Sequence, residues 1–402
     1  HYTFSVTNNI NILPTLIAEK QDVAQSTPIY SAAGRLTFNA QNITQSGIVK
    51  VPFGLLTLNA ADQLRLTNGS VTSVSGDGVT VPFGLGLGGL NWLYPFDSNA
   101  SVALPINVPP EKRLVLSGQQ VFLDKGASIN LSGGGDLYAY EFISGAGGSQ
   151  DFLNTTLPSN ANKFAVLPDL QRALTPYDPI EMADSQIKMG DSVYLAAGSG
   201  LAAGWYTVLP AHYALLPNAY LVTPIAGTQD WQPNQTAKDV AGTTLVAGRL
   251  GDVNAGIQNA RWQGFAVQSG KVARTYSEYT DYFANDFFAQ KVNDVIAQTA
   301  QLPKDAGNLT LNAQNNLGLN ANFFMLPVGD GQGSLVDISA DHLAIVSRRE
   351  DANANKDTDK VSLFVEDLNK LGAASLLLGG VRSQTKNGQL LNRPYRKPVS
   401  IY

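Results

Sequence analysis

Apolar and polar residues alternate in several short stretches of this chain, and three of those stretches are nearly identical. They read GRLTFNA, GLLTLNA and GNLTLNA, at residues 34–40, 54–60 and 307–313. In the second stretch, Leu56 and Leu58 point to one side of an extended backbone while Thr57 points to the other, which is the two-residue period of a β-strand. The pattern therefore predicts three equivalent strands, each with one apolar face.

The first two stretches start 20 residues apart, and this interval predicts how their strands are arranged. Repeats of about 20 residues, each with several short strands and Gly-bearing turns, stack into a solenoid whose neighbouring coils share backbone hydrogen bonds. We therefore predict an all-β fold, a parallel β-helix (β-solenoid), with Leu36 beside Leu56 and Phe38 beside Leu58. An antiparallel sandwich is the alternative, but it would not place near-identical stretches one coil length apart.

The regular pattern stops near residue 150 and resumes with the third stretch. Prolines recur in between, and proline is expelled from central strands because it cannot donate a backbone hydrogen bond. GDSVYLAAG (190–198) and NAYLVTP (218–224) predict strands of a separate small β unit. In residues 275–300, apolar side chains recur every three to five positions, which predicts the one helix.

The predicted organisation therefore has three parts. Residues 1–150 form β-solenoid coils, residues 151–305 form an inserted mixed β/α excursion with the helix at 275–300, and residues 306–402 form resumed coils and a C-terminal tail. Because the third stretch repeats the pattern of the first, we expect Leu309 and Leu311 to join the same core as the coils before residue 150.

Composition excludes several classes of partner and site. The net charge is −5 and only 15% of residues are charged, so no basic stripe exists for a nucleic acid and no nucleic-acid partner is expected. The chain has no cysteine, which excludes disulfides and thiolate chemistry. Its longest apolar run, residues 371–381, is shorter than the roughly 18–20 residues of a spanning helix, so no membrane span is expected.

No catalytic residue is predicted. The three histidines are His1, His212 and His342, and the chain contains no GxSxG, HExxH or P-loop sequence. A β-helix enzyme that cleaves polysaccharides is the alternative, with Asp337 and Asp341 on one polar strand face. Four residues along a strand separate their carboxylates by about 13 Å, whereas paired-acid glycosidases need about 5–9.5 Å. We therefore expect no enzyme and no cofactor.

One loop has the spacing of calcium ligands. The sequence DANANKDTD (351–359) contains the five oxygen-bearing residues Asp351, Asn353, Asn355, Asp357 and Asp359. However, Lys356 takes the place where a calcium loop needs Gly, and Ser362 stands where a bidentate Glu is required. This loop is a weak calcium candidate, and we expect no resident metal.

Aromatic residues of the excursion are the candidate ligand-binding residues. They are Trp205, Tyr206, Tyr213, Tyr220, Trp231 and Trp262. Binding energy concentrates in Trp and Tyr anchors, and the first four lie on consecutive predicted strands, where some would share one face. The alternative for each is a place in the core of a small domain. Trp231 and Trp262 have polar neighbours, which favours exposure.

Three longer segments indicate a family resemblance. Residues 133–153 (GGGDLYAYEFISGAGGSQDFL), 189–224 (beginning MGDSVYLAAGSG) and 371–383 (LGAASLLLGGVRS) resemble parts of filamentous-haemagglutinin-type large exoproteins, a family of two-partner-secreted bacterial surface adhesins. The resemblance implies a right-handed β-helix that is exported through a partner pore in the outer membrane. It also implies an extracellular or outer-cell-surface location. Because the family's amino-terminal secretion module is not visible here, we expect an interior or C-terminal segment.

Three functions follow as hypotheses. The first is a secreted or cell-surface adhesin or structural exoprotein segment, in which the solenoid is a stiff scaffold and the excursion binds a glycan or protein of a host or neighbouring cell, or serves in assembly. The second is a self-assembling extracellular fibre or sheath subunit, and the third is the polysaccharide-cleaving β-helix enzyme. An exposed aromatic cluster would favour the first, apolar uncapped coil ends the second, and carboxylates less than about 10 Å apart in a groove the third.

Overall fold

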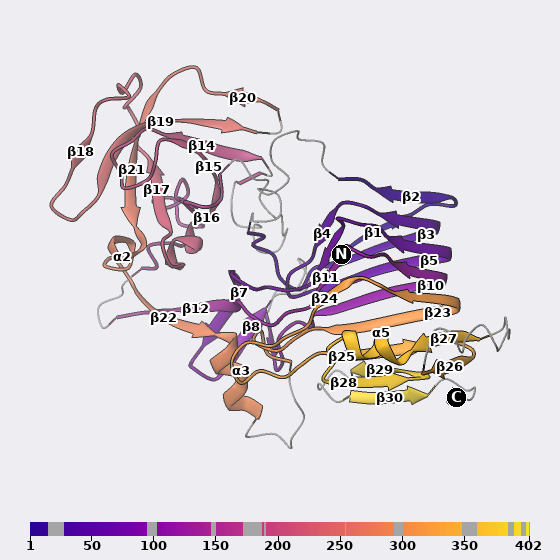
Figure 1. Ribbon diagram of the computed structural model, residues 1–402. Helices are drawn as coiled ribbons and strands as arrows, with labels where there is room; N and C mark the ends of the chain where they lie inside the picture. The colour runs from indigo at the N-terminus through magenta and orange to yellow at the C-terminus, as the bar shows by residue number, and fades with distance from the viewer. Residues whose placement is uncertain are drawn as a thin grey trace. The chain divides into compact units, whose positions relative to one another are not determined.

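The computed structural model describes most of the chain as two compact units (Figure 1). The described residues are 1–14, 28–94, 103–145, 150–171, 187–188, 190–253, 255–292, 301–347, 360–384, 390–394 and 399–401. The first unit comprises residues 1–81, 107–137 and 283–402, and the second comprises residues 82–106 and 138–282. The chain is mostly β-structure, as predicted, and many of its strands are parallel.

The larger sheet of the first unit is built from parallel strands in the order β1–β3–β5–β10–β23–β25–β28, with β2 also paired to β3. Figure 1 shows β3, β5, β10 and β23 lying side by side. The bounds are β1 Tyr2–Ser5, β2 Asn9–Ile12, β3 Arg35–Gln45, β5 Leu55–Leu66, β10 Arg113–Leu123, β23 Asn308–Leu319, β25 Leu335–Ser339 and β28 Ser375–Leu378.

The predicted neighbours in this sheet are confirmed. Leu36 lies opposite Leu56, and Phe38 lies opposite Leu58, on parallel strands. Leu56 and Leu58 are fully buried, whereas Thr57 between them is half-buried, as the two-residue alternation requires. The repeated stretches are therefore equivalent strands with one apolar face each.

The third stretch joins the same core, as expected. Leu309 lies opposite Leu114, and Leu311 lies opposite Leu116, and all four belong to one buried cluster with Leu56 and Leu58. The strands β10 and β23 are thus direct neighbours, although about 180 residues of chain separate them.

Glycine and asparagine in the repeated stretch each have a structural reason. A Cβ atom at Gly54 would lie 2.4 Å from the carbonyl oxygen of Gly34, so only glycine lets the two backbones approach this closely. At the sixth position the Asn59 amide donates to Asn39, and the Asn39 amide donates to Ser5. These bonds form a ladder of side chains along the outer surface of the sheet.

A second parallel sheet faces the same core. Its order is β24–β11–β6–β4, and each strand follows one of the long strands after a short turn. The bounds are β4 Ile48–Lys50, β6 Val71–Ser73, β11 Ser128–Asn130 and β24 Asn322–Phe324. Val49 and Ile129 from this sheet are buried among the leucines of the larger sheet. Two parallel sheets therefore share one apolar core and repeat in the same strand order.

Shorter elements complete the first unit. A three-stranded parallel sheet contains β27, β26 and β31, and an antiparallel pair contains β29 and β30. The bounds are β26 Leu343–Val346, β27 Val361–Phe364, β29 Gly380–Gln384, β30 Leu390–Pro394, β31 Val399–Ile401, and helices α3 Ala284–Val292 and α5 Val365–Lys370. Parts of the C-terminal tail thus belong to sheets.

The second unit contains a nine-stranded antiparallel sheet with the order β15–β14–β19–β21–β17–β13–β16, in which β18 and β20 also pair with β19. The bounds are β13 Phe164–Val166, β14 Asp191–Leu195, β15 Gly204–Thr207, β16 Leu209–Pro210, β17 Tyr220–Pro224, β18 Ala237–Lys238, β19 Thr244–Asp252, β20 Ile257–Gln258 and β21 Gln263–Ser269, with η1 Ala211–Leu215 and α2 Gly270–Ala273. The strands predicted at 190–198 and 218–224 are confirmed as β14 and β17. One face of this sheet carries the unit's own apolar core.

A five-stranded sheet has the order β22–β12–β7–β8–β9. Its bounds are β7 Thr80–Leu87, β8 Asn91–Tyr94, β9 Leu104–Ile106, β12 Asp136–Ile143 and β22 Glu278–Phe283. The second unit includes residues 82–106 and 138–145, which were expected in the coils before residue 150. The first unit includes residues 283–292 and 301–305, which were expected in the excursion.

The single helix predicted at 275–300 is wrong over its first part. Residues 278–283 form strand β22, helix α3 covers Ala284–Val292, and residues 293–300 lie outside the described ones. The sequence EYTDYF is rich in aromatic and β-branched residues, which favour strands. Its tyrosines also reach distant carboxylates, since Tyr279 donates to Asp151 at 2.5 Å and Tyr282 donates to Glu141 at 2.6 Å. Short helices also occur elsewhere, at α2 and α5.

Among the described residues, no helix combines the length and the apolar character that crossing a membrane requires.

The shared core of the first unit leads to a prediction about stability. Leu311→Ala should lower the free energy of unfolding by about 2–5 kcal/mol, because Leu311 is fully buried among strands that come from distant parts of the chain. Asn316→Ala changes an exposed residue of the same strand and should cost about 0.5 kcal/mol or less. Urea unfolding of both variants measures the difference. Equal losses would show that β23 does not depend on this core.

Candidate functional site

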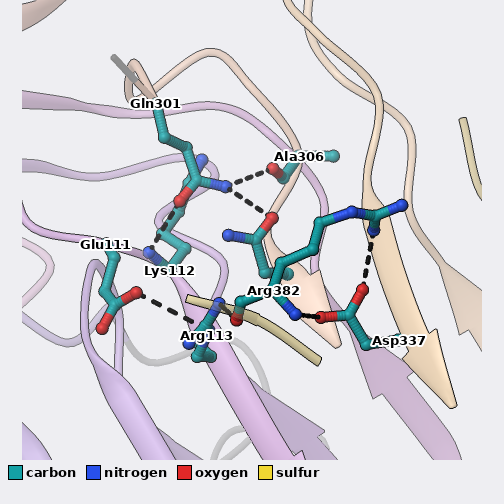
Figure 2. A network of polar contacts seen from close by, with 8 residues as sticks. Glu111, Lys112, Arg113, Gln301, Ala306, Asp337 and Arg382 are labelled. Carbon is teal, nitrogen blue, oxygen red and sulfur yellow. Dashed lines mark hydrogen bonds and ion pairs between the residues drawn. The ribbon is translucent and has the colours of Figure 1, made fainter. Parts of the chain in front are cut away.

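Charged side chains form a buried network in the first unit, around β10, β25 and β29 (Figure 2). Asp337 occupies an outward-facing register position, next to Thr310 of β23 and Leu377 of β28, yet only 3% of it is exposed. Both of its carboxylate oxygens bind Arg382. The Arg382 amide donates to Oδ2 at 2.6 Å, and the guanidinium Nη1 donates to Oδ1 at 2.7 Å.

The surroundings of Asp337 explain its electrostatics. Burial raises the pKa of Asp337, and the backbone bond from Arg382 and the positive charges of Arg382 and Arg113 oppose this rise. Arg113 in turn donates to the Arg382 carbonyl at 3.1 Å and lies 3.6 Å from the Glu111 carboxylate. The network therefore fastens β29 to β25 and to the start of β10.

The expectation that Asp337 and Asp341 share one polar strand face is wrong, because β25 ends at Ser339 and Asp341 lies between β25 and β26. Asp337 and Ser339 are both buried, and the Asp337 carboxylate is fully engaged by one arginine. Ser339 donates to Asn312 at 2.5 Å and so continues the ladder of polar side chains. These residues hold strands together, and the sequence missed this because Arg382 lies 45 residues further on.

Lys112 is the second buried charge of the network, and 1% of it is exposed. Its register position corresponds to Gly54 and Gly307 in the neighbouring strands. The ammonium group donates to the carbonyls of Pro303, at 2.6 Å, and Asp305. Burial lowers the pKa of Lys112 to about 8, and the nearby charge of Asp305 opposes this effect.

The contacts of Lys112 fix the segment that leads into β23. Its amide donates to the Gln301 side chain at 3.2 Å, and Gln301 donates to the Ala306 carbonyl at 2.7 Å (Figure 2). The backbone carbonyl of Lys112 accepts a hydrogen bond from the Asn308 amide at 2.7 Å. Lys112 therefore binds residues 301–308 on both sides of the turn and sets the position at which β23 begins.

The lowered pKa of Lys112 predicts a pH dependence of stability. Between pH 8 and pH 10.5 the unfolded chain, with an ordinary lysine pKa, binds more protons than the folded one, so this residue makes the free energy of unfolding rise with pH. Relative to Lys112→Met, the wild type should gain about 2 kcal/mol between pH 7.5 and pH 10.

Urea unfolding at both pH values measures this gain. Lys125→Met, which removes an exposed lysine, is the matched control. Parallel pH profiles of wild type and Lys112→Met would contradict the prediction.

The second candidate site lies in the second unit, on its nine-stranded sheet. Tyr194 of β14 lies opposite Trp205 of β15 on one side and opposite Arg249 of β19 on the other. Trp262 directly precedes β21, the next strand. We call Trp205, Tyr194, Arg249 and Trp262 the aromatic row, which crosses four neighbouring strands.

The rings of the aromatic row contact one another. Tyr194 meets Trp205 edge to face, with ring centres 5.7 Å apart and planes at 73°. Tyr194 meets Trp262 in the same manner, at 5.7 Å and 76°. The Arg249 guanidinium carbon lies 4.1 Å from the centre of the Trp262 ring, within the range of a cation–π interaction. The row is therefore continuous.

The aromatic row occupies the face of the sheet opposite to the core. Val193 and Leu195, the neighbours of Tyr194 in the strand, are fully buried in the core of the unit. All four members of the row are half-buried, so part of each remains accessible. Gly251 makes room for the row, because a Cβ atom there would lie 2.8 Å from the Trp205 ring.

The side chain of Arg249 makes no hydrogen bond and no ion pair in the part of the chain that the structure describes, and its Nε atom is buried. Its guanidinium carbon lies over the Trp262 ring. A guanidinium without a carboxylate, held on the outer face of a sheet, is able to bind an anion.

The six aromatic residues predicted from the sequence as ligand-binding residues lie in different environments. Trp205 and Trp262 are in the aromatic row. Trp231 is half-buried beside Gly264 on the same face, and its indole donates to the Gln235 carbonyl at 2.9 Å. Tyr220 is half-buried near Gly200.

Tyr206 and Tyr213 do not present a surface. Tyr206 is in the core of the unit and donates to the Ala202 carbonyl at 2.6 Å, and burial raises its pKa. Tyr213 is buried in η1, where its ring packs against His212. The core alternative therefore holds for these two residues, because both side chains are buried.

The sequence missed Tyr194 and Arg249. Tyr194 sits between Val193 and Leu195, so its outward orientation follows from strand alternation. Arg249 carried no such signal, since its place depends on the pairing of β19 with β14.

The described residues offer no new candidate for a metal site. No group of three or more His, Asp or Glu side chains suited to a metal occurs among the described residues. The calcium candidate, Asp351, Asn353, Asn355, Asp357 and Asp359, lies outside them.

Comparisons with family models, with curated proteins and with solved structures found no match.

Proposed function

We propose that this chain is a segment of a secreted or cell-surface adhesin, exported through an outer-membrane pore, in which the first unit is a stiff scaffold and the second unit is the binding element. The scaffold would be a right-handed parallel β-helix. Two features support the β-helix: the parallel strands in register, and the second parallel sheet whose strands follow the long ones in the same order.

The aromatic row is the observation that carries the binding role. The rings of the row remain partly accessible on the outer face, and tryptophan and tyrosine supply large contact areas with little conformational freedom to lose. The C–H face of a sugar ring packs well on such rings. A glycan of a host or neighbouring cell is therefore the ligand we favour over a protein.

One observation favours the alternative of a self-assembling fibre or sheath subunit. The edge strand β1 exposes 63% of Tyr2 and 52% of Phe4, and edge strands are templates for further pairing. The engagement of Asp337 by Arg382 is an argument against the polysaccharide-cleaving enzyme, because Asp337 is one of the two carboxylates that the sequence offered for it. We therefore propose a chain that binds and does not catalyse.

The proposal predicts a loss of adhesion without a loss of folding. Trp205→Ala combined with Trp262→Ala should weaken binding of the whole chain to cells or to a glycan array about tenfold or more, because each substitution removes an aromatic anchor. The melting temperature should change by only a few degrees, since both rings lie outside the core.

Ile257→Ala is the control, because Ile257 is 67% exposed on β20 of the same sheet and outside the row. It should leave adhesion unchanged. Unaltered adhesion of the double variant, with an intact melting transition, would contradict the proposal.

A further inference from the structure

We infer that the aromatic row binds a saccharide that carries a carboxylate, as in a uronic-acid polysaccharide, and that Arg249 binds this carboxylate. The inference rests on the proposed function of glycan binding, and it names the class of sugar. It depends on the position of Arg249 within the row and on the lack of a carboxylate partner for its guanidinium among the described residues.

Arg249 differs from four other arginines that the structure describes. Those four each pair with a carboxylate: Arg65 with Asp124, Arg113 with Glu111, Arg274 with Asp281, and Arg382 with Asp337. Arg249 pairs with none, although it is half-buried and its Nε is fully shielded. A partly desolvated cation favours an anionic partner, so the row is complementary in charge to an acidic ligand.

The acidic residues of the adjacent strands do not compete for Arg249. Asp191 lies two residues before Val193, and Asp252 lies two residues after Leu250, so strand alternation places both on the core side of the sheet. Asp230, whose amide donates to the Trp262 carbonyl at 2.7 Å, is exposed and makes no ion pair with Arg249. The guanidinium therefore remains available on the outer face.

The neighbours of Arg249 match the other part of such a ligand. Tyr194 is its neighbour on the adjacent strand, and the Arg249 guanidinium carbon lies 4.1 Å from the centre of the Trp262 ring. A uronic acid has an apolar C–H face and a carboxylate at the edge of the same ring. One sugar residue can thus lie against an aromatic ring while its carboxylate accepts two parallel hydrogen bonds from the planar guanidinium.

The experiment compares a charged ligand with a neutral derivative of the same sugar chain. Calorimetric titration of the whole chain uses oligogalacturonate and its methyl ester, in metal-free buffer. The methyl ester keeps the sugar ring and loses the charge. We expect the wild type to bind the acid about tenfold or more tightly than the ester, since a charge-assisted bidentate contact is worth at least that factor.

Substitutions assign the preference to a residue. Arg249→Met keeps the aliphatic stem beside Trp262 and removes the charge, and it should bind acid and ester equally. Lys238→Met removes an exposed positive charge from β18 of the same sheet and should keep the preference. If Arg249→Met fails to fold, the comparison of acid and ester on the wild type still tests the preference for the acid, and equal affinity there overturns the inference.

Two results would overturn the inference. Equal affinity of the wild type for acid and ester would show that the rings bind sugars without Arg249, and glycan binding itself would stand. Binding of neither ligand, together with adhesion that still depends on Trp205 and Trp262, would show that the sugar is of another class.

Discussion

The close approach of two parallel backbones at Gly54, the start of the second repeated stretch, is the constraint on which the first unit depends. Gly54 lies so near the Gly34 carbonyl that a side chain would collide with it, and the Leu55 amide donates to that same carbonyl at 2.9 Å. With this contact fixed, Leu56 falls beside Leu36. A slip of one residue would turn every leucine of the strand to the outer side, so glycine, leucine and the ladder of asparagines all specify one register.

The register of the parallel strands must also hold at β23, which follows a long stretch of chain outside the sheet. At the start of the neighbouring strand β10, a buried lysine stands at the position that glycine has at the start of β5. Lys112 takes the position of Gly54 in β10, and its side chain turns inward to bind the Pro303 and Asp305 carbonyls. The cost of burying an ammonium group is visible as a lowered pKa. In return, the turn before β23 is held on two sides, and Leu309 enters the core in the correct register. Asp337 and Arg382 fasten β29 in a similar way.

Local periodicity was sufficient to predict the parallel strands of the first unit, because the spacing of repeats and the alternation of leucines both report on register. It was insufficient at residues 278–283, where apolar spacing suggested a helix. There, Tyr279 and Tyr282 bind carboxylates more than 100 residues away in sequence, and these contacts favour the extended conformation. Lys112 and Asp337 were also beyond prediction, since their partners are distant and a charged residue in a sequence is ordinarily exposed.

The aromatic row was likewise predictable from the sequence only in part. Alternation places Tyr194 on the outer face, but only the pairing of β14 with both β15 and β19 brings Trp205 and Arg249 beside it. Arg274 and Arg382 are matched with carboxylates from the chain itself, and those pairs stabilise the fold. Arg249 has no such partner among the residues that the structure describes, and its guanidinium lies over the Trp262 ring. A half-buried charge that the fold leaves unpaired is costly to keep for structure alone, which is the physical reason for regarding this face of the sheet as a binding surface.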